Sequence, residues 1–90
     1  MAILVLEHTF ETPMSTEELN DSAKRLDTCL AAHGARWMRT YLSQDRKRMI
    51  CEFEAADAEQ VRESARSAGI SFDRCWPAAL FAREDPTASY

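Results

Sequence analysis

The fold of this chain is decided by residues 36–54, which have the sequence RWMRTYLSQDRKRMICEFE. Residues 36–43 predict a β-strand, whose period of two places Trp37, Arg39 and Tyr41 on one face and Met38, Thr40 and Leu42 on the other. Residues 48–54 alternate in the same way, and the charged segment 44–47 between them predicts a turn. The stretch therefore predicts a β-hairpin.

A helix is predicted on each side of this hairpin. Before it, Ser15 and Glu18 form a capping box, an apolar stripe follows at helical spacing, and Gly34 marks the helix end. After it, Asp57 caps a second amphipathic helix that ends at Gly69. The hairpin is therefore expected to lie between two helices in the chain.

Two further strands complete the pattern. Residues 2–9 form a short, continuous apolar run, which indicates a central strand. Residues 72–82 predict a last strand, and Pro77 restricts it to a sheet edge, a bulge or a strand break. The order strand, helix, strand, strand, helix, strand predicts an α+β protein of ferredoxin-like βαββαβ topology, with both helices on one face of a four-stranded antiparallel sheet. We expect one domain over residues 1–83 and a polar tail over 84–90.

The predicted sheet has one face that the helices cover and one face that they leave open. Period-two alternation places the following residues on the covered face: Leu4, Leu6, Phe10, Met38, Leu42, Met49 and Phe53. The open face is expected to carry Ile3, Val5, Glu7, Trp37, Arg39, Tyr41, Ile50 and Glu52. So apolar a face favours an interface or a ligand groove. We predict a homodimer in which two such faces form an α/β-barrel-like assembly.

Composition excludes some classes of partner and compartment. The net charge of −4 argues against nucleic acid, whose phosphates attract basic surfaces. No stretch approaches the roughly 20 apolar residues of a membrane span, and residues 2–6 lack the pattern of a signal peptide, so a cytoplasmic location is expected. The three cysteines include no C-x-x-C pair and are expected to be free thiols.

The chain resembles a family of small bacterial proteins, domain of unknown function 4242, whose members are often labelled nickel-binding. The resemblance covers roughly residues 2–80. It is carried by Val5-Leu6-Glu7-His8-Thr9-Phe10, by Trp37-Met38-Arg39-Thr40-Tyr41-Leu42-Ser43 with Asp45, by Cys51-Glu52-Phe53-Glu54-Ala55 and by the helix Ala58–Ala65. It implies a ferredoxin-like dimer that binds a divalent metal such as nickel at or near the dimer surface.

The resemblance extends to some site positions and fails at others. Cys51 stands where the family commonly has a cysteine, and Glu7 matches an acidic position at the end of the first strand. Where the family commonly has a histidine between the Trp and Tyr of the second strand, this chain has Arg39, whose guanidinium has no lone pair for a metal. His8 stands where arginine is frequent.

Three functions remain open on these residues. The first is a binding module for nickel or zinc, with His8, Glu7 and Cys51 as candidate ligands, or for a small ligand between Trp37, Arg39, Tyr41 and Glu52. The second is a cofactor-free isomerase, cyclase or monooxygenase with Arg39, Tyr41 and Glu7 as catalytic candidates. The third is self-association alone, in which an Arg39–Glu52 pair fixes the register of the dimer.

Each candidate also has a simpler structural interpretation. His8 shares the strand phase of Leu6 and Phe10, which is more typical of a partly buried, hydrogen-bonded histidine near a strand end than of a ligand. His33, just before Gly34, is explained by its place at a helix C-terminus. Cys51 in a buried strand is expected to have a raised pKa and to be unreactive. No glycine-rich phosphate loop occurs, which argues against a nucleotide cofactor.

Overall fold

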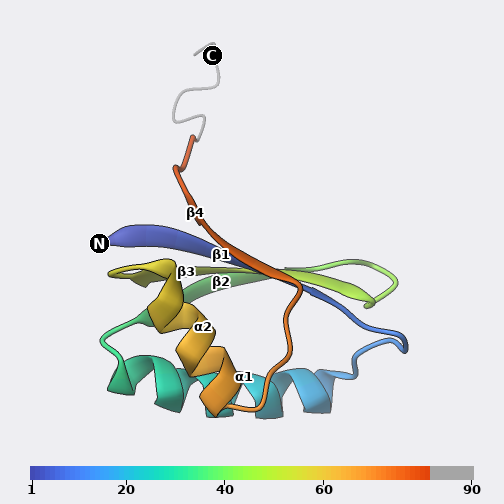
Figure 1. Ribbon diagram of the computed structural model, residues 1–90. Coiled ribbons are helices and arrows are strands. Elements are labelled where there is room, and N and C mark those ends of the chain that lie inside the picture. Colours follow the sequence, from blue (N-terminus) through green and yellow to red (C-terminus); the bar gives the residue numbers. More distant parts are fainter. Residues whose placement is uncertain (82–90) are drawn as a thin grey trace.

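A computed structural model describes residues 1–81 of the chain (Figure 1). The elements follow one another as β1 (Ala2–Thr9), α1 (Thr16–Ala32), β2 (Arg36–Leu42), β3 (Arg48–Ala55), α2 (Ala58–Ser67) and β4 (Arg74–Ala78). This is the predicted βαββαβ order. The last strand is shorter than the predicted 72–82, and the predicted tail, 84–90, lies outside the described residues.

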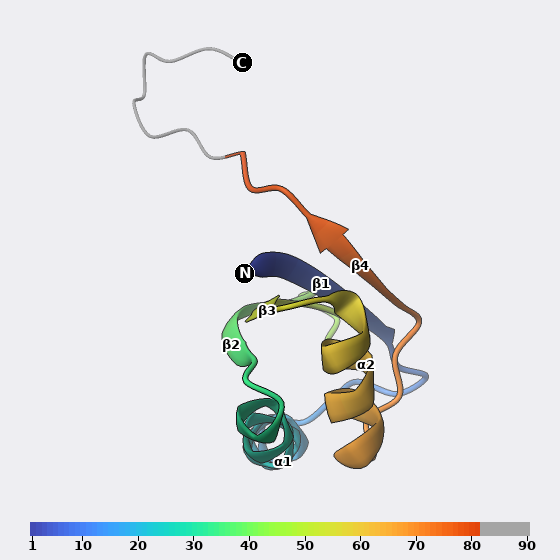
Figure 2. The same cartoon turned by 60° about the vertical axis from the view of Figure 1, so that its left-hand side comes forward.

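The four strands form one antiparallel sheet in the order β2-β3-β1-β4. Figures 1 and 2 show both helices beneath the same face of this sheet, so the predicted ferredoxin-like architecture is confirmed. The apolar strand β1 is central, as expected, and among the described strands β4 is an edge strand that pairs with β1 alone. Pro77 lies in that edge strand, where the missing N–H of proline is tolerated.

The residues predicted from the sequence to begin and end the two helices do so in the structure. At α1, Ser15 Oγ accepts from the Glu18 N–H at 3.1 Å, and the Glu18 carboxylate accepts from the Ser15 N–H at 3.3 Å. At α2, the Asp57 carboxylate accepts from the Gln60 N–H at 3.0 Å. Gly34 and Gly69 follow the two helices with φ of 70° and 71°, the left-handed region that glycine enters without steric cost.

The hydrophobic core lies between the sheet and the helices. Its largest fully buried apolar side chains are Phe53, Leu4, Leu6, Leu30 and Val61. They come from β1, β3, α1 and α2, so the core joins the two central strands to both helices. Within the described residues, no helix is long and apolar enough to cross a membrane.

A β-bulge in β2 moves Trp37 from the predicted open face of the sheet to the face that the helices cover. Trp37 pairs with Phe53 of β3 and Arg39 pairs with Glu52, so Met38 is an extra residue between them. Because Phe53 faces the helices, Trp37 lies on the helix side of the sheet, together with Thr40. The prediction that Trp37 shares the open face with Arg39 and Tyr41 is therefore wrong, because strict alternation fails at Met38.

Candidate functional site

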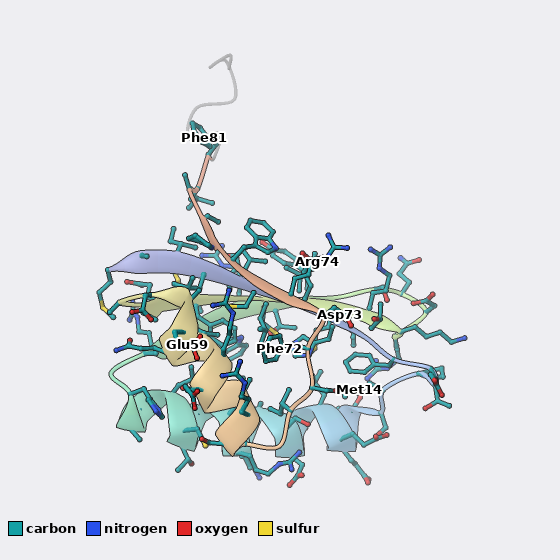
Figure 3. All side chains as sticks on the ribbon, viewed as in Figure 1. Met14, Glu59, Phe72, Asp73, Arg74 and Phe81 are labelled. Carbon is teal, nitrogen blue, oxygen red and sulfur yellow. The ribbon has the colours of Figure 1, made fainter. Side chains whose placement is uncertain are left out.

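A cavity of about 170 Å³ lies between α1 and the sheet. Its apolar lining includes Phe10, Met14, Leu19, Leu26, Trp37 and Ile70, and the strands contribute His8, Thr40 and Cys51. Figure 3 shows Met14 on the helix side of the sheet, in the segment that joins β1 to α1, whereas Arg74 lies on the opposite side. The cavity thus combines an apolar wall with a small polar group on the sheet.

His8 is held in this cavity in one orientation. Its side chain is buried, and Nδ1 lies 2.8 Å from the backbone carbonyl oxygen of Ser71. A carbonyl oxygen only accepts, so Nδ1 donates and the neutral ring carries its lone pair on Nε2. Burial lowers the pKa of His8, although the Ser71 hydrogen bond and the charge of Asp73 oppose that change. Phe10 stacks on the ring at a centroid distance of 6.0 Å.

Cys51 lies next to the free nitrogen of His8, with its Sγ 4.0 Å from Nε2. The register of β1 with β3 pairs His8 with Met49 and Leu6 with Cys51, so His8 and Cys51 are diagonal neighbours on the helix side. Burial raises the pKa of the Cys51 thiol, as expected from its strand, and a hydrogen bond from Thr40 opposes that rise. We refer to His8 and Cys51 as the dyad.

Two side chains of β2 extend the dyad into a chain of hydrogen bonds. The Trp37 indole N–H donates to Thr40 Oγ1 at 2.9 Å, and the Thr40 hydroxyl donates to Cys51 Sγ at 3.2 Å. The Cys51 thiol then faces His8 Nε2, and His8 donates to Ser71. All donors therefore point in one direction, from β2 through β3 to β1, which orients the side chains on the sheet side of the cavity.

Glu7, the third predicted metal ligand, lies on the opposite face of β1. Its carboxylate accepts from the Trp76 indole N–H at 2.7 Å. Successive strand residues point to opposite faces, so Glu7 and His8 cannot converge on one ion within this chain. Among residues 1–81, no group of three or more His, Cys, Asp or Glu side chains is arranged to hold a metal.

The remaining predicted site residues share the open face of the sheet. Arg39 forms an ion pair with Glu52 at 3.2 Å, and Tyr41 is mostly exposed. Tyr41 and Glu7 each pair with Ile50, so they belong to one row across β2, β3 and β1. Arg39, Tyr41 and Glu7 thus lie on one face as the enzyme hypothesis requires, and their catalytic role stays a prediction. Trp37 does not join Arg39, Tyr41 and Glu52 in a ligand site.

The sequence reasoning missed Thr40 and Ser71 as partners of the dyad. Thr40 shares the strand phase of Leu42, so alternation assigns Thr40 to the covered face. That assignment was the one sequence signal that could have identified Thr40 as a neighbour of Cys51. Ser71 lies in the connection between α2 and β4, 63 residues from His8, and no local pattern joins them. All three cysteines are free thiols, as predicted.

Comparison with known proteins shows the family of this chain and a solved structure with a similar fold. Residues 5–77 match the family described as "Nickel responsive protein SCO4226-like". The crystal structure of SCO4226 from Streptomyces coelicolor A3(2) superimposes with a TM-score of 0.82 at 16% sequence identity, over 90% of this chain and 100% of that chain. No curated protein matches the chain. The family match spans most of the sequence, so the chain belongs to the SCO4226-like family of nickel-responsive proteins.

Proposed function

We propose that this protein binds Ni²⁺, or a divalent cation of similar chemistry such as Zn²⁺, through His8 Nε2 and Cys51 Sγ. The observation that carries the proposal is the 4.0 Å separation of these two atoms, with the lone pair of Nε2 directed at the thiol. Imidazole and thiolate are the side-chain donors that nickel and zinc prefer. The description of the family as nickel responsive supports the same choice of metal.

Two features of the dyad suit a metal ion: the distance between its two ligand atoms and the hydrogen bond that orients His8. A zinc ion bonds imidazole nitrogen at about 2.0–2.1 Å and thiolate sulfur at about 2.3 Å, so one ion spans donors up to about 4.4 Å apart. Metal-binding histidines usually donate their other ring N–H to a carbonyl or carboxylate, as His8 does to Ser71. The dyad supplies two donors, and water would fill the other positions.

Arg39 does not oppose this assignment. Members of the family that the sequence resembles commonly have a histidine at this position of β2, and arginine cannot replace histidine as a metal ligand. Arg39 lies on the open face and is paired with Glu52 at 3.2 Å, whereas the dyad lies on the helix side. The sheet lies between the Arg39 guanidinium and the dyad, and Glu52 offsets the charge of Arg39. Arg39 is therefore expected to repel a cation at the dyad only weakly.

Calorimetric titration of the metal-free protein with Ni²⁺ tests the proposal. We expect saturable 1:1 binding that Cys51→Ser weakens at least about tenfold, in the range found when metal sites lose supporting groups. Cys75→Ser is the matched control, because Cys75 is also a buried strand cysteine but does not line the cavity. Since Cys51 is a thiol and His8 is neutral, binding should release about one proton, measured in buffers of different ionisation enthalpy. Absence of saturable binding would refute the metal function.

A second proposal concerns self-association through the open sheet face, defined by Ile3, Val5, Glu7, Arg39, Tyr41, Ile50, Glu52 and Trp76. The observation that favours it is the exposure of Tyr41, Ile50 and Trp76, which are 57%, 41% and 42% exposed. Large apolar side chains gathered on one face mark interaction sites. Two copies of the chain related by a two-fold axis would cover each other's open faces. The corresponding experiment on oligomeric state is given in the Discussion.

A further inference from the structure

We propose that the cavity between α1 and the sheet binds a neutral organic molecule of one-ring size that carries a single hydroxyl group, the chemistry of a simple phenol. This site does not depend on the metal proposal, because it is argued from the volume and lining of the cavity. The two proposals share the dyad, His8 and Cys51, which lies in the lining of the cavity.

The volume sets the size of the ligand. The cavity holds about 170 Å³. An engineered apolar cavity of about 150 Å³ in another protein stays free of water and binds benzene. A single six-membered ring with one or two small substituents therefore fits, whereas a nucleotide or a fused polycyclic molecule does not.

The lining sets the charge of the ligand. Apolar side chains from both layers face the cavity, among them Leu19 and Leu26 of α1, Trp37 of β2 and Met49 of β3. Within residues 1–81, no lysine or arginine contributes to the lining, and the one carboxylate is that of Asp27, an exposed residue. An anionic ligand would lose its hydration without gaining a cationic partner, so the site favours a neutral molecule.

The dyad sets the position of the hydroxyl group. His8 donates from Nδ1 to Ser71, which leaves Nε2 as a buried acceptor. Its only donor among the described residues is the Cys51 thiol at 4.0 Å, and thiols are weak donors. A phenolic hydroxyl is a stronger donor, so the ligand is expected to direct its O–H at Nε2 and its ring at the apolar lining.

Access to the cavity runs between α1 and β2. Three of its lining residues are exposed, namely Asn20 and Asp27 of α1 and Trp37 of β2. The bulge at Met38 directs Trp37 to this side, where its indole N–H is bonded to Thr40 at 2.9 Å. The ring of Trp37 is thus held at the mouth, where it can pack against an aromatic ligand.

The test is a titration of the metal-free protein, with a chelator present, using 4-methylphenol, toluene and 4-methylbenzoate. Methyl NMR should show saturable shifts confined to lining residues such as Leu19, Leu26 and Ile70. One added hydrogen bond should make 4-methylphenol bind about threefold to tenfold more tightly than toluene. The benzoate should bind at least about tenfold more weakly than the phenol. Absence of saturable shifts, or shifts centred on the open face, would overturn the proposal.

A matched pair of variants on α1 locates the site. Ala23→Leu fills the cavity and should weaken binding of 4-methylphenol at least about tenfold, whereas Ala31→Leu, on the exposed side of α1, should leave it unchanged. Equal binding by Ala23→Leu and the wild type contradicts the site. If Ala23→Leu does not fold, the shift pattern of the wild-type protein decides. Cys51→Ser should still bind toluene, so loss of nickel binding and loss of ring binding are separately visible.

Discussion

Burial acts on the two residues of the dyad in complementary ways. It raises the pKa of the Cys51 thiol and lowers the pKa of the His8 imidazole, and both changes favour the neutral form. Two neutral groups cost less to bury than a thiolate–imidazolium pair. In the absence of metal the two potential metal ligands are therefore uncharged, and a cation must displace the thiol proton of Cys51 to bind both atoms.

The lowered pKa of His8 predicts a pH-dependent stability of the metal-free protein. Unfolded His8 titrates near pH 6.5, whereas folded His8 stays neutral to lower pH. Below about pH 6.5 the unfolded chain therefore binds more protons, and the free energy of unfolding falls as the pH falls, by at most about 1.4 kcal/mol per pH unit. Urea denaturation at several pH values between 5 and 8, in steps of about half a unit, measures this slope.

Two variants assign the slope to His8. His8→Gln should flatten the dependence below about pH 6.5 and lower the stability at neutral pH, because the bond to Ser71 is perturbed. His33→Gln, at the exposed histidine, should keep the wild-type slope. A slope that survives in His8→Gln would assign the effect to the carboxylates or to other groups.

At the scale of elements, the β2–β3 turn holds the start of α1 in place. Arg46 in this turn has a φ of 62°, the only positive value outside glycine among the described residues. Its Nε donates to the Met14 carbonyl at 2.6 Å, and the Met14 N–H donates to the Arg46 carbonyl at 2.9 Å. Nη2 also donates to Thr16 at 3.1 Å. The turn thus fixes the segment from which Met14 enters the cavity.

Replacement of Arg46 separates backbone strain from side-chain contact. Both Arg46→Gly and Arg46→Ala lose the bonds to Met14 and Thr16, but only alanine keeps a Cβ in the left-handed region. That conformation costs an L-residue about 1–2 kcal/mol. We therefore expect Arg46→Ala to be less stable than Arg46→Gly by about 1 kcal/mol in chemical denaturation. The opposite order would show that the turn changes conformation when the arginine is lost.

The bulge in β2 is the element that sequence reasoning did not predict. No glycine in residues 36–43 marks an insertion at Met38. Polar and apolar residues also occur on both faces of this strand, since Trp37 and Thr40 share one and Arg39 and Tyr41 the other. A strand with so weak a contrast between its faces specifies its register poorly. Pairing with β3 decides it, and Trp37 contributes to the cavity as a result.

At the scale of the whole molecule, the two helices cover one face of the sheet and leave the other without cover from the described residues (Figures 1 and 2). On the open face, ion pairs and hydrogen bonds alternate with apolar groups. Arg39 is paired with Glu52, and the Trp76 indole N–H donates to Glu7. The charges of Arg39 and Glu52 offset each other, and the Glu7 carboxylate keeps its charge but has a hydrogen-bond donor in Trp76, so a second copy can cover this face at a smaller desolvation cost than unpaired charges require.

The open face predicts a dimer that a single charge disrupts. We expect the wild-type chain to sediment with twice its sequence mass and Ile50→Glu to sediment as a monomer, because the new carboxylate lies on β3, one of the two central strands of the face. Ala31→Glu adds the same charge on the solvent side of α1 and should remain dimeric. Sedimentation equilibrium over a range of concentrations measures both. A monomeric wild-type chain would contradict self-association.

The sequence by itself determined the elements, their order and the ends of both helices. Ser15, Asp57, Gly34 and Gly69 act on the residues next to them, and the apolar run of residues 2–9 identifies a central strand without reference to the rest of the chain. These signals are local in the chain, because caps and periodicity depend on neighbours within a few residues. They were sufficient for the ferredoxin-like fold.

Only the tertiary structure decided the dyad, the orientation of Trp37 and the cavity. His8 and Cys51 are 43 residues apart and meet because β1 and β3 pair in one particular register. The carbonyl of Ser71, which directs Nε2 toward the thiol, reaches His8 from a connection at the other end of the chain. Contacts of this kind depend on how strands pair and layers pack, and no pattern of neighbouring residues encodes them.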